Sequence, residues 1–212
     1  MNNMPTFQRI PLLVLISAPS GAGKTTLCRN LLAKHSEFTR VITCTTRAPR
    51  PGEHDGVDYY FLSPQAFDAR LKAGEFLEYA TVFGNSYGTL RSEVLAKLRA
   101  GRDVLLNIDV QGAASVRVHA QGDPELSAAL VTVFLTPPSF AELESRLRNR
   151  GTESLEVLEH RLGVARKEIA CWVDFQYLLT SGSMAEDLRR LEVIIEAERL
   201  RRGRSKPPEE FC

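Results

Sequence analysis

The sequence has no excess of charge of one sign. Its 212 residues include 27 lysines and arginines against 26 aspartates and glutamates, a formal net charge of +1. Proteins that follow a nucleic-acid backbone need a cationic surplus to neutralise many phosphates, so this balance argues against a nucleic-acid partner while leaving room for a local anion site. Hydrophobic residues make up 43% of the chain. That share is enough for a substantial core, which excludes intrinsic disorder and favours a single domain.

Cysteine pairs and long hydrophobic runs are also missing. The longest early apolar run, residues 10–16, is far shorter than the about 20 residues that cross a bilayer, and the N-terminal residues lack the pattern of a signal peptide. No Cys-x-x-Cys pair or histidine at metal-ligand spacing accompanies the four cysteines, Cys28, Cys44, Cys171 and Cys212. We interpret them as reduced thiols and expect a cytoplasmic protein with no membrane partner.

Three apolar runs predict buried strands of a parallel sheet. They cover residues 10–16, 104–108 and 130–135, and their side chains do not alternate between apolar and polar, which is typical of strands covered on both faces. Helical patterns follow each run, the first beginning near Lys24. This alternation predicts an α/β fold with a parallel sheet core flanked by helices.

Two segments interrupt the alternation. Residues 39–100 are rich in Thr, Arg, Pro, Gly and Tyr, and we interpret them as an inserted mixed α/β lobe that binds the second substrate. Residues 137–169 begin at a Pro-Pro pair, and Ser139 is placed to cap a charged helix. We interpret this segment as a small helical lid. The remaining segments form the core of the single domain: 10–38, 101–136 and 170–205.

The C-terminal part of the chain is helical and then basic. A helical pattern begins near Met184 and continues into several closely spaced arginines. We interpret this basic cluster as a solvated helix end, made of Arg199, Arg201, Arg202, Arg204 and Lys206.

A glycine-rich loop follows the first apolar run. Residues 18–25 match the phosphate-loop pattern G-x-x-x-x-G-K-[ST], except that Ala18 replaces the first glycine. Small residues let backbone N–H groups approach phosphate oxygens, and the following helix adds the positive end of its dipole. We predict that Lys24 contacts the β and γ phosphates of a bound nucleotide and that Thr25 ligates Mg²⁺. The residues predicted to bind these phosphates are Ala18, Pro19, Ser20, Gly21, Ala22, Gly23, Lys24, Thr25 and Thr26.

A second anion site is predicted in the inserted lobe. Arg47 and Arg50 are held by neighbouring prolines in a stiff turn, close to threonine hydroxyls and to Tyr59. Guanidinium groups suit bidentate phosphate binding, and tyrosine hydroxyls can add hydrogen bonds. Together with the glycine-rich loop, this pattern predicts transfer of a phosphoryl group to a phosphorylated acceptor.

Several separated motifs resemble those of guanylate kinases. They are SAPSGAGKTTL, TTRAPRPGEHDGVDYYF, FGNSYGT and IDVQG, and they follow that family's order and spacing between about residues 12 and 200. The resemblance implies a P-loop nucleoside monophosphate kinase that transfers the γ-phosphate of ATP to GMP with Mg²⁺, giving ADP and GDP. Both a monomer and a dimer are compatible with it. The implied GMP-binding residues are Thr43, Arg47, Arg50, Tyr59, Glu78, Tyr87, Thr89 and Asp109.

The chemistry of these residue types agrees with that role. The Glu78 carboxylate could accept both the N1–H and the 2-amino hydrogens of guanine, with Thr89 completing the contact, and adenine lacks that pair of donors. The second pKa of a phosphate monoester is about 6, so the attacking oxygen of GMP is mostly deprotonated at pH 7. No general base is needed, and catalysis can rest on positioning and charge neutralisation.

The metal and the transferring phosphoryl group have further candidate partners. Asp109 follows a buried strand, where ligands and metals gather in open α/β sheets, so it is a second candidate Mg²⁺ ligand. Arginines of the lid share a helix face, which the resemblance assigns to the transferring group, although a solvated salt-bridged face gives the same pattern. The predicted catalytic residues are Lys24, Arg47, Arg146, Arg150 and Arg161.

Two alternatives remain open. One is a kinase for another phosphorylated acceptor, against which Glu78 and Thr89 argue. The other is a non-catalytic module that binds peptides, against which the intact glycine-rich loop argues. The chain departs from the family at Asn107, where an acidic residue is common, and at residues 180–183, where TSGS replaces V-N-D-D. Metal binding at the first position and adenine binding at the second therefore stay open.

Overall fold

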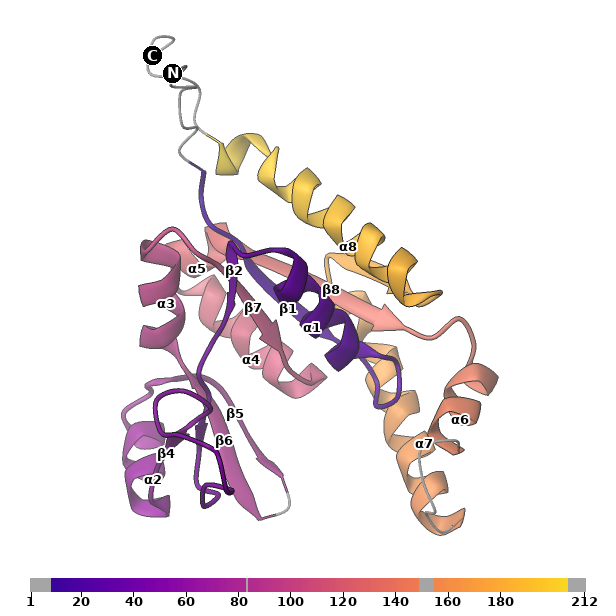
Figure 1. Cartoon of the computed structure of the whole chain (residues 1–212), viewed down its shortest axis with the longest axis horizontal. Coiled ribbons are helices and arrows are strands. Elements are labelled where there is room, and N and C mark those ends of the chain that lie inside the picture. The colour runs from indigo at the N-terminus through magenta and orange to yellow at the C-terminus, as the bar shows by residue number, and fades with distance from the viewer. Residues whose placement is uncertain (1–8, 83, 149–154, 206–212) are drawn as a thin grey trace.

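The computed structural model describes residues 9–82, 84–148 and 155–205, with the backbone alone at 155 and 156. At its centre is a five-stranded parallel sheet with helices on both faces, which confirms the α/β fold class (Figure 1). In spatial order the strands are β2 (Phe38–Arg40), β7 (Asp103–Asn107), β1 (Leu13–Ser17), β8 (Leu130–Thr136) and β9 (Tyr177–Thr180).

The central strand, β1, is buried along its whole length, as its unbroken apolar sequence predicts. It begins at Leu13, three residues later than the apolar run. Pro11 has no N–H to donate, and the Leu12 amide donates to Oδ1 of Asp103 at 2.8 Å. The start of the strand is therefore set by backbone hydrogen bonding and not by hydrophobicity.

Helices cover the two faces of this sheet (Figure 1). Val14 and Ile16 pack in one apolar cluster with α1 and α8, while Leu13 and Leu15 pack in a second with α3, α4 and α5. Because both faces are filled, the carboxyl end of β1 is held in a rigid frame. The bounds are α1 (Lys24–Lys34), α3 (Arg91–Arg99), α4 (Val110–Gln121), α5 (Pro124–Ala129) and α8 (Met184–Arg199).

A second, mixed sheet lies beside the carboxyl ends of the central strands (Figure 1). It has its own small core, in which the rings of Phe67 and Phe76 stack with centroids 4.4 Å apart. A Cβ added at Gly88 would lie 2.8 Å from the Phe76 ring, so only glycine fits there. The elements are β4 (Tyr60–Phe61), β3 (Cys44–Thr45), β6 (Asn85–Leu90) and β5 (Phe76–Val82) in spatial order, with α2 (Pro64–Lys72).

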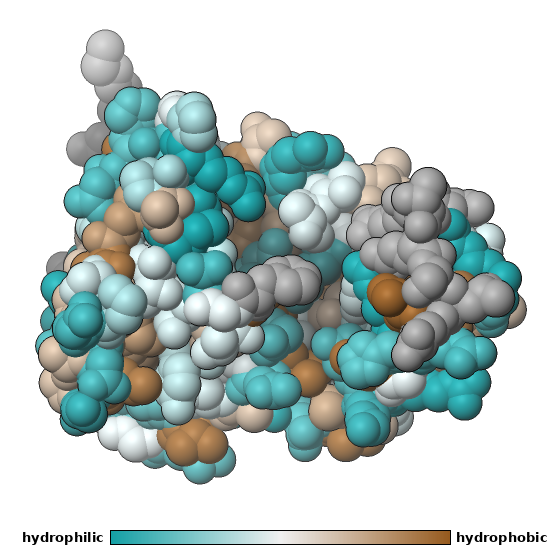
Figure 2. Space-filling view, turned by 90° about the horizontal axis from the view of Figure 1, so that it is seen from below, coloured by the Kyte–Doolittle hydropathy of each residue, from teal (hydrophilic) through white to brown (hydrophobic). Residues whose placement is uncertain are grey.

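Two helices, α6 (Phe140–Arg148) and α7 (Leu155–Ala170), project on the other side of the central sheet (Figure 1). Ser139 caps α6, as expected, by accepting a hydrogen bond from the Glu142 amide at 3.1 Å. The short 3₁₀ helix η1 (Cys171–Asp174) then leads into β9. Seen from below, the surface between the small sheet and these two helices is hollowed and bordered largely by hydrophilic residues (Figure 2).

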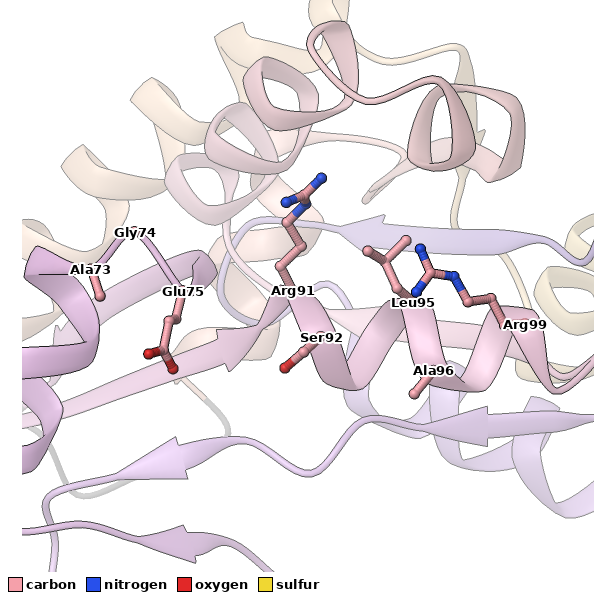
Figure 3. A pocket seen from close by; sticks show the side chains of 8 residues that line it. All are labelled: Ala73, Gly74, Glu75, Arg91, Ser92, Leu95, Ala96 and Arg99. Carbon is pink, nitrogen blue, oxygen red and sulfur yellow. The ribbon is translucent and has the colours of Figure 1, made fainter.

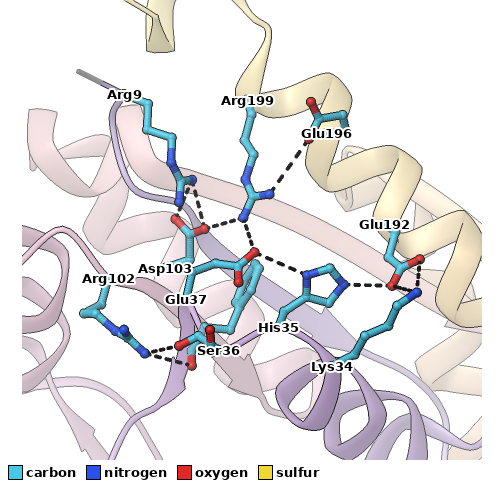
Figure 4. Close-up of polar contacts among 11 residues, drawn as sticks. Arg9, Lys34, His35, Ser36, Glu37, Arg102, Asp103, Glu192, Glu196 and Arg199 are labelled. Carbon is cyan, nitrogen blue, oxygen red and sulfur yellow. Dashed lines mark hydrogen bonds and ion pairs between the residues drawn. The ribbon is translucent and has the colours of Figure 1, made fainter. Parts of the chain in front are cut away.

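The interpretation of the C-terminal arginines as a solvated helix end was wrong for two of them. Arg199 lies over the Phe38 ring and donates to Asp103 at 2.7 Å and to Glu37 at 3.0 Å (Figure 4). Arg204, in the 3₁₀ helix η2 (Arg202–Arg204), is buried and paired with Glu198. Their carboxylate partners compensate the charges, so these two side chains are packed into the fold while Arg201 and Arg202 are exposed. Lys206 lies outside the described residues.

Candidate active site

The glycine-rich loop joins β1 to α1, as predicted. Gly21 and Gly23 have left-handed backbone, with φ angles of 94° and 96°, and Gly23 is the N-cap of α1. This conformation is readily open only to glycine. It aims backbone N–H groups and the positive end of the α1 dipole into the space above the loop, which is the arrangement that binds phosphate.

That space is a cavity of about 250 Å³, in which the predicted loop residues meet two acidic side chains from other elements. Lys24 donates from Nζ to the backbone oxygen of Ile108 at 2.6 Å, and its burial lowers the pKa of the ammonium group. The nearby negative charges of Asp109 and Glu168 partly offset this effect. The lining residues are Ala18, Pro19, Ser20, Gly21, Ala22, Gly23, Lys24, Thr25, Thr26, Asp109 and Glu168.

Asp109 reaches the cavity from the carboxyl end of β7. It is the N-cap of α4, where its Oδ1 accepts from the Gly112 amide at 2.8 Å. The neighbouring Asn107 ends β7 with an exposed side chain. Asp109 and Thr25 thus offer a carboxylate and a hydroxyl to one cavity, and oxygen ligands of this kind suit Mg²⁺ when substrate phosphates and waters supply the rest.

Glu168 was not predicted from the sequence. It lies on α7, and its Oε2 accepts from the Ser20 amide at 3.4 Å, a long hydrogen bond. Burial raises the pKa of this carboxyl. The sequence held one indication that Glu168 belongs to the site: it lies seven residues after Arg161, a predicted catalytic residue, and so shares a helix face with it. Nothing in the sequence, however, places that face against the glycine-rich loop.

The predicted acceptor-phosphate residues gather on the small sheet and the loop beside it. Arg47 lies 5.4 Å from the Tyr59 ring, and the rings of Tyr59 and Tyr87 are 6.2 Å apart. Both oxygens of Glu53 accept from Arg47 Nη2 at 2.9 Å, and Glu53 also accepts from the Arg50 amide at 2.7 Å. The hydrogen bond to Glu53, followed by one with Tyr87, raises the pKa of Arg47.

Arg50 and Thr43 occupy the edges of this group. Arg50 is exposed, which leaves its guanidinium accessible to a ligand. Thr43 comes directly before β3, and its backbone oxygen accepts from the Tyr60 amide at 3.0 Å.

Glu78 and Thr89 face each other across β5 and β6. They are register partners, and the Thr89 hydroxyl donates to Oε1 of Glu78 at 2.5 Å. Only 7% of Glu78 is exposed, and this burial raises the pKa of its carboxyl, while the Thr89 hydrogen bond works in the opposite direction. A buried carboxylate with one oxygen already bound is a directional acceptor for a planar ligand with paired donors.

Arg146, one of the predicted lid arginines, lies on α6. Its Nε donates to Glu142 at 2.8 Å and its Nη1 to the Ser181 hydroxyl at 3.4 Å. Arg161 lies half-buried on α7. Arg150 lies outside the described residues. Leu147 of α6 covers the glycine-rich loop, since a Cβ at Gly21 would lie 3.0 Å from its Cδ2.

The segment that departs from V-N-D-D is anchored by one buried side chain, Ser181. Ser181 Oγ donates to Oδ2 of Asp187 at 3.0 Å, and the Gly182 amide donates to Oδ1 at 2.7 Å. Asp187 is 1% exposed. The segment therefore ties the end of β9 to the first turn of α8 and places Ser181 within reach of Arg146.

A larger hollow of about 710 Å³ lies elsewhere, between the turn after α2 and one face of α3 (Figure 3). Its charged side chains are already paired: Arg91 with Asp123 at 2.5 Å, and Arg99 with Glu125 at 2.8 Å. We therefore locate the candidate site at the smaller cavity, where charged groups converge on helix N-termini. None of the described helices is long and apolar enough to cross a membrane.

Comparison with known proteins gives one consistent family. The family model described as "Guanylate kinase" matches residues 11–198. A guanylate kinase of Maricaulis maris is 42% identical over 96% of this chain and 91% of its own length, and one of Idiomarina loihiensis is 48% identical over 88% and 87%. The crystal structure of guanylate kinase from Anaplasma phagocytophilum superposes with a TM-score of 0.71 and 28% identity, covering 97% of this chain and 95% of that one.

Proposed function

The chain belongs to the guanylate kinase family, and from that premise we propose that it transfers the γ-phosphate of ATP to GMP, giving ADP and GDP. One observation carries this proposal. Residues 108–112 touch both halves of the site: the Ile108 oxygen accepts from Lys24 of the glycine-rich loop, and a Cβ at Gly112 would lie 3.0 Å from the Glu78 carboxylate. The glycine-rich loop and the buried carboxylate of Glu78 therefore meet at one segment, which supports the proposal that they bind the two substrates side by side.

In this proposal the loop residues from Ala18 to Thr26 bind the donor phosphates. Their amides and the α1 dipole supply positive potential, and Lys24 adds a charge fixed by the Ile108 carbonyl. Thr25 and Asp109 would hold Mg²⁺, which would neutralise charge on the β and γ phosphates. Both side chains present oxygen atoms to the cavity, so the donor set fits this ion.

The acceptor phosphate would lie between the arginines and tyrosines of the small sheet and of the loop beside it. Arg47 and Arg50 neutralise it, and Tyr59 and Tyr87 donate hydroxyl hydrogen bonds. Because a phosphate monoester has its second pKa at about 6, the attacking oxygen needs no protein base at pH 7. The contribution of these residues is orientation for in-line attack.

Guanine would be read by Glu78 and Thr89, with Thr43 and Asp109 as further GMP contacts. The free lone pairs of the buried Glu78 carboxylate accept from N1–H and the 2-amino group. Adenine presents no such donors, so it would leave a buried charge unpaired, and a loss of this kind discriminates strongly between ligands.

The lid would complete the site around the transferring group. Arg146 and Arg161 stand on the two lid helices and would stabilise charge that develops on the phosphoryl group, as would Arg150. Closure of α6 and α7 over the loop would exclude water, which otherwise competes with GMP for the phosphoryl group. We further propose that the protein works in the cytoplasm, where the free thiols of Cys28, Cys44 and Cys171 would stay reduced.

The test is ADP formation by the purified protein with ATP and Mg²⁺, with GMP, dGMP, AMP or no acceptor. We expect strong turnover with GMP and little with AMP, and we expect Glu78→Ala to remove that preference. Turnover equal for GMP and AMP would contradict the role of Glu78. GMP binding without turnover would instead favour a non-catalytic module.

A further inference from the structure

Gly112 occupies a position where glycine is unfavourable for the local structure. It lies in the first turn of α4 and is buried, and glycine in a helix costs about 1 kcal/mol relative to alanine. Its backbone has no need of glycine, because the glycines with left-handed backbone in the described chain are others. The hydrogen bond that its amide donates to Asp109 could be donated by any residue except proline.

The reason for glycine lies in what a side chain would meet. A Cβ at residue 112 would be 3.0 Å from Oε2 of Glu78 and 3.4 Å from Cβ and Cδ1 of Ile108. The contact with Glu78 is the tighter one, and one neighbour would have to move. An alanine could therefore be accommodated only by a shift of α4 or of the carboxylate.

Glu78 is held so that such a shift has a cost. Its Oε1 accepts from the Thr89 hydroxyl, and its strand is tied to α4 by the Ser115 hydroxyl, which donates to the Leu77 backbone oxygen at 2.9 Å. One oxygen of the carboxylate is thus held by Thr89 of β6, and the strand that carries Glu78 is held against α4 by Ser115. Moving Oε2 would tilt the plane of the carboxylate away from its Thr89 partner.

We propose that Gly112 is a specificity-determining positioning residue, because it leaves the space in which the Glu78 carboxylate takes its base-reading orientation. This inference rests on the proposed function, in which Glu78 reads guanine. Gly112 touches no reacting atom. It acts through Glu78, and the first turn of α4 sets the orientation of the acceptor base.

The first experiment compares Gly112→Ala with Gly122→Ala. Gly122 ends the same helix, and there a Cβ would meet only the His119 backbone oxygen at 3.8 Å, an ordinary contact. We expect Gly112→Ala to raise KM for GMP about ten- to a hundredfold, the size of effect that a misplaced contact can have. It should leave KM for ATP unchanged and lower the preference in kcat/KM for GMP over IMP, which lacks the 2-amino group. Gly122→Ala should change none of these.

The second experiment needs no substrate. Thermal unfolding midpoints of the parent, Gly112→Ala, Glu78→Ala and the double variant form a double-mutant cycle. If the Glu78 carboxylate is the obstacle, Gly112→Ala lowers the midpoint in the parent but not in the Glu78→Ala background, where the better helix former raises it. A loss that is equal in both backgrounds would place the obstacle at Ile108 and overturn the inference.

The two readouts separate this inference from the proposed function. Coupling in the unfolding cycle, together with unchanged GMP kinetics in Gly112→Ala, would show that the space above Gly112 is filled by a carboxylate that does not read the base. This result would overturn both the inference and the role of Glu78. Absence of coupling with normal GMP-dependent turnover of the parent would overturn the inference alone. Coupling together with a higher KM for GMP would support both.

Discussion

The Nη2 atom of Arg47 donates to both carboxylate oxygens of Glu53, each at 2.9 Å. Glu53 also accepts from the Arg50 amide at 2.7 Å, so one carboxylate fixes a guanidinium and the loop that carries the second arginine. The acceptor phosphate would therefore meet Arg47 in an orientation that is set before it binds.

Glu53→Gln should consequently weaken GMP binding without changing ATP binding. We expect KM for GMP to rise about tenfold, because a displaced guanidinium no longer matches the phosphate oxygens. Steady-state kinetics with each substrate varied in turn would measure this. The matched control is Glu75→Gln, which weakens an exposed ion pair with Arg70 on the same lobe. An unchanged KM for GMP in Glu53→Gln would show that the pair is only structural.

Lys24→Met should abolish most of the turnover while leaving GMP bound. Its Nζ donates to the Ile108 carbonyl at the cavity of the glycine-rich loop, and removal of one electrostatic contact to a transferring group costs about 10²–10³ in kcat. Single-turnover kinetics and GMP titration by calorimetry would separate the two effects. Lys34→Met, at the far end of the same helix, removes an exposed pair with Glu192 and should have normal kcat. Normal turnover of Lys24→Met would contradict the assignment.

The stability of the protein should depend on the protonation of Glu78 at pH values above those at which an ordinary glutamate is protonated. Burial raises the pKa of this carboxyl in the folded protein, so between its ordinary value of 4.5 and the raised value the folded state binds more protons than the unfolded one. Stability therefore falls as pH rises through that window. Glu78→Gln should raise the Tm at pH 7, by about 2–4 °C per kcal/mol recovered, and the gain should shrink toward pH 4. A Tm for Glu78→Gln below that of the parent at pH 7 would contradict the burial argument.

GMP affinity should show the opposite dependence on pH. The carboxylate accepts hydrogen bonds from guanine only when ionised, so affinity should weaken as pH falls through the raised pKa. The GMP phosphate, with its own pKa of about 6, adds a dependence that Glu78→Gln should keep, while that variant should lose the share of the carboxylate. Titration of GMP by calorimetry from pH 8 to pH 5 would check this.

Asp103 should be a major determinant of stability. It is fully buried and accepts from Arg9 at 2.9 Å and from Arg199 at 2.7 Å (Figure 4). It also accepts from the Leu12 amide. Asp103→Ala removes the carboxylate partner of Arg9 and of the Leu12 amide and leaves Arg199 with Glu37, and loss of one member of a buried ion pair costs about 3–5 kcal/mol. Urea unfolding would measure it. Glu125→Gln, which weakens the exposed pair with Arg99, should cost at most about 1 kcal/mol.

The local parts of the fold were predictable from the sequence. The turn at Gly21 and Gly23 could be predicted because the loop, its preceding strand and its following helix are contiguous, and the backbone angles depend on the glycines themselves. The Ser139 cap was predictable for the same reason, since its partner is three residues away. Such features depend on short-range sterics and hydrogen bonds, which a sequence displays directly.

Long-range partners were not predictable from local patterns, and only the family resemblance implied that Glu78 and Thr89 share a site. The basic cluster gave no sign that Arg199 would be neutralised by Asp103, which is 96 positions earlier in the chain. Similarly, Glu168 has no local feature that separates it from other helical glutamates, and only the packing of α7 against the glycine-rich loop makes it part of the cavity. The pairing of Glu78 with Thr89 required a β-bulge in the register between β5 and β6.

The polar network that includes Arg9 and Arg199 lies where the two ends of the described chain meet. Arg9 forms a β-bridge with Ser205, and the Ile10 amide donates to the Arg204 oxygen at 3.0 Å. The start and the end of the described chain are thus adjacent. Joining them would leave the strand order of the sheets unchanged, wherever the chain then began. A short linker between the ends, with new termini at the exposed turn around Gly101, would preserve every strand neighbour, so this architecture is suited to circular permutation.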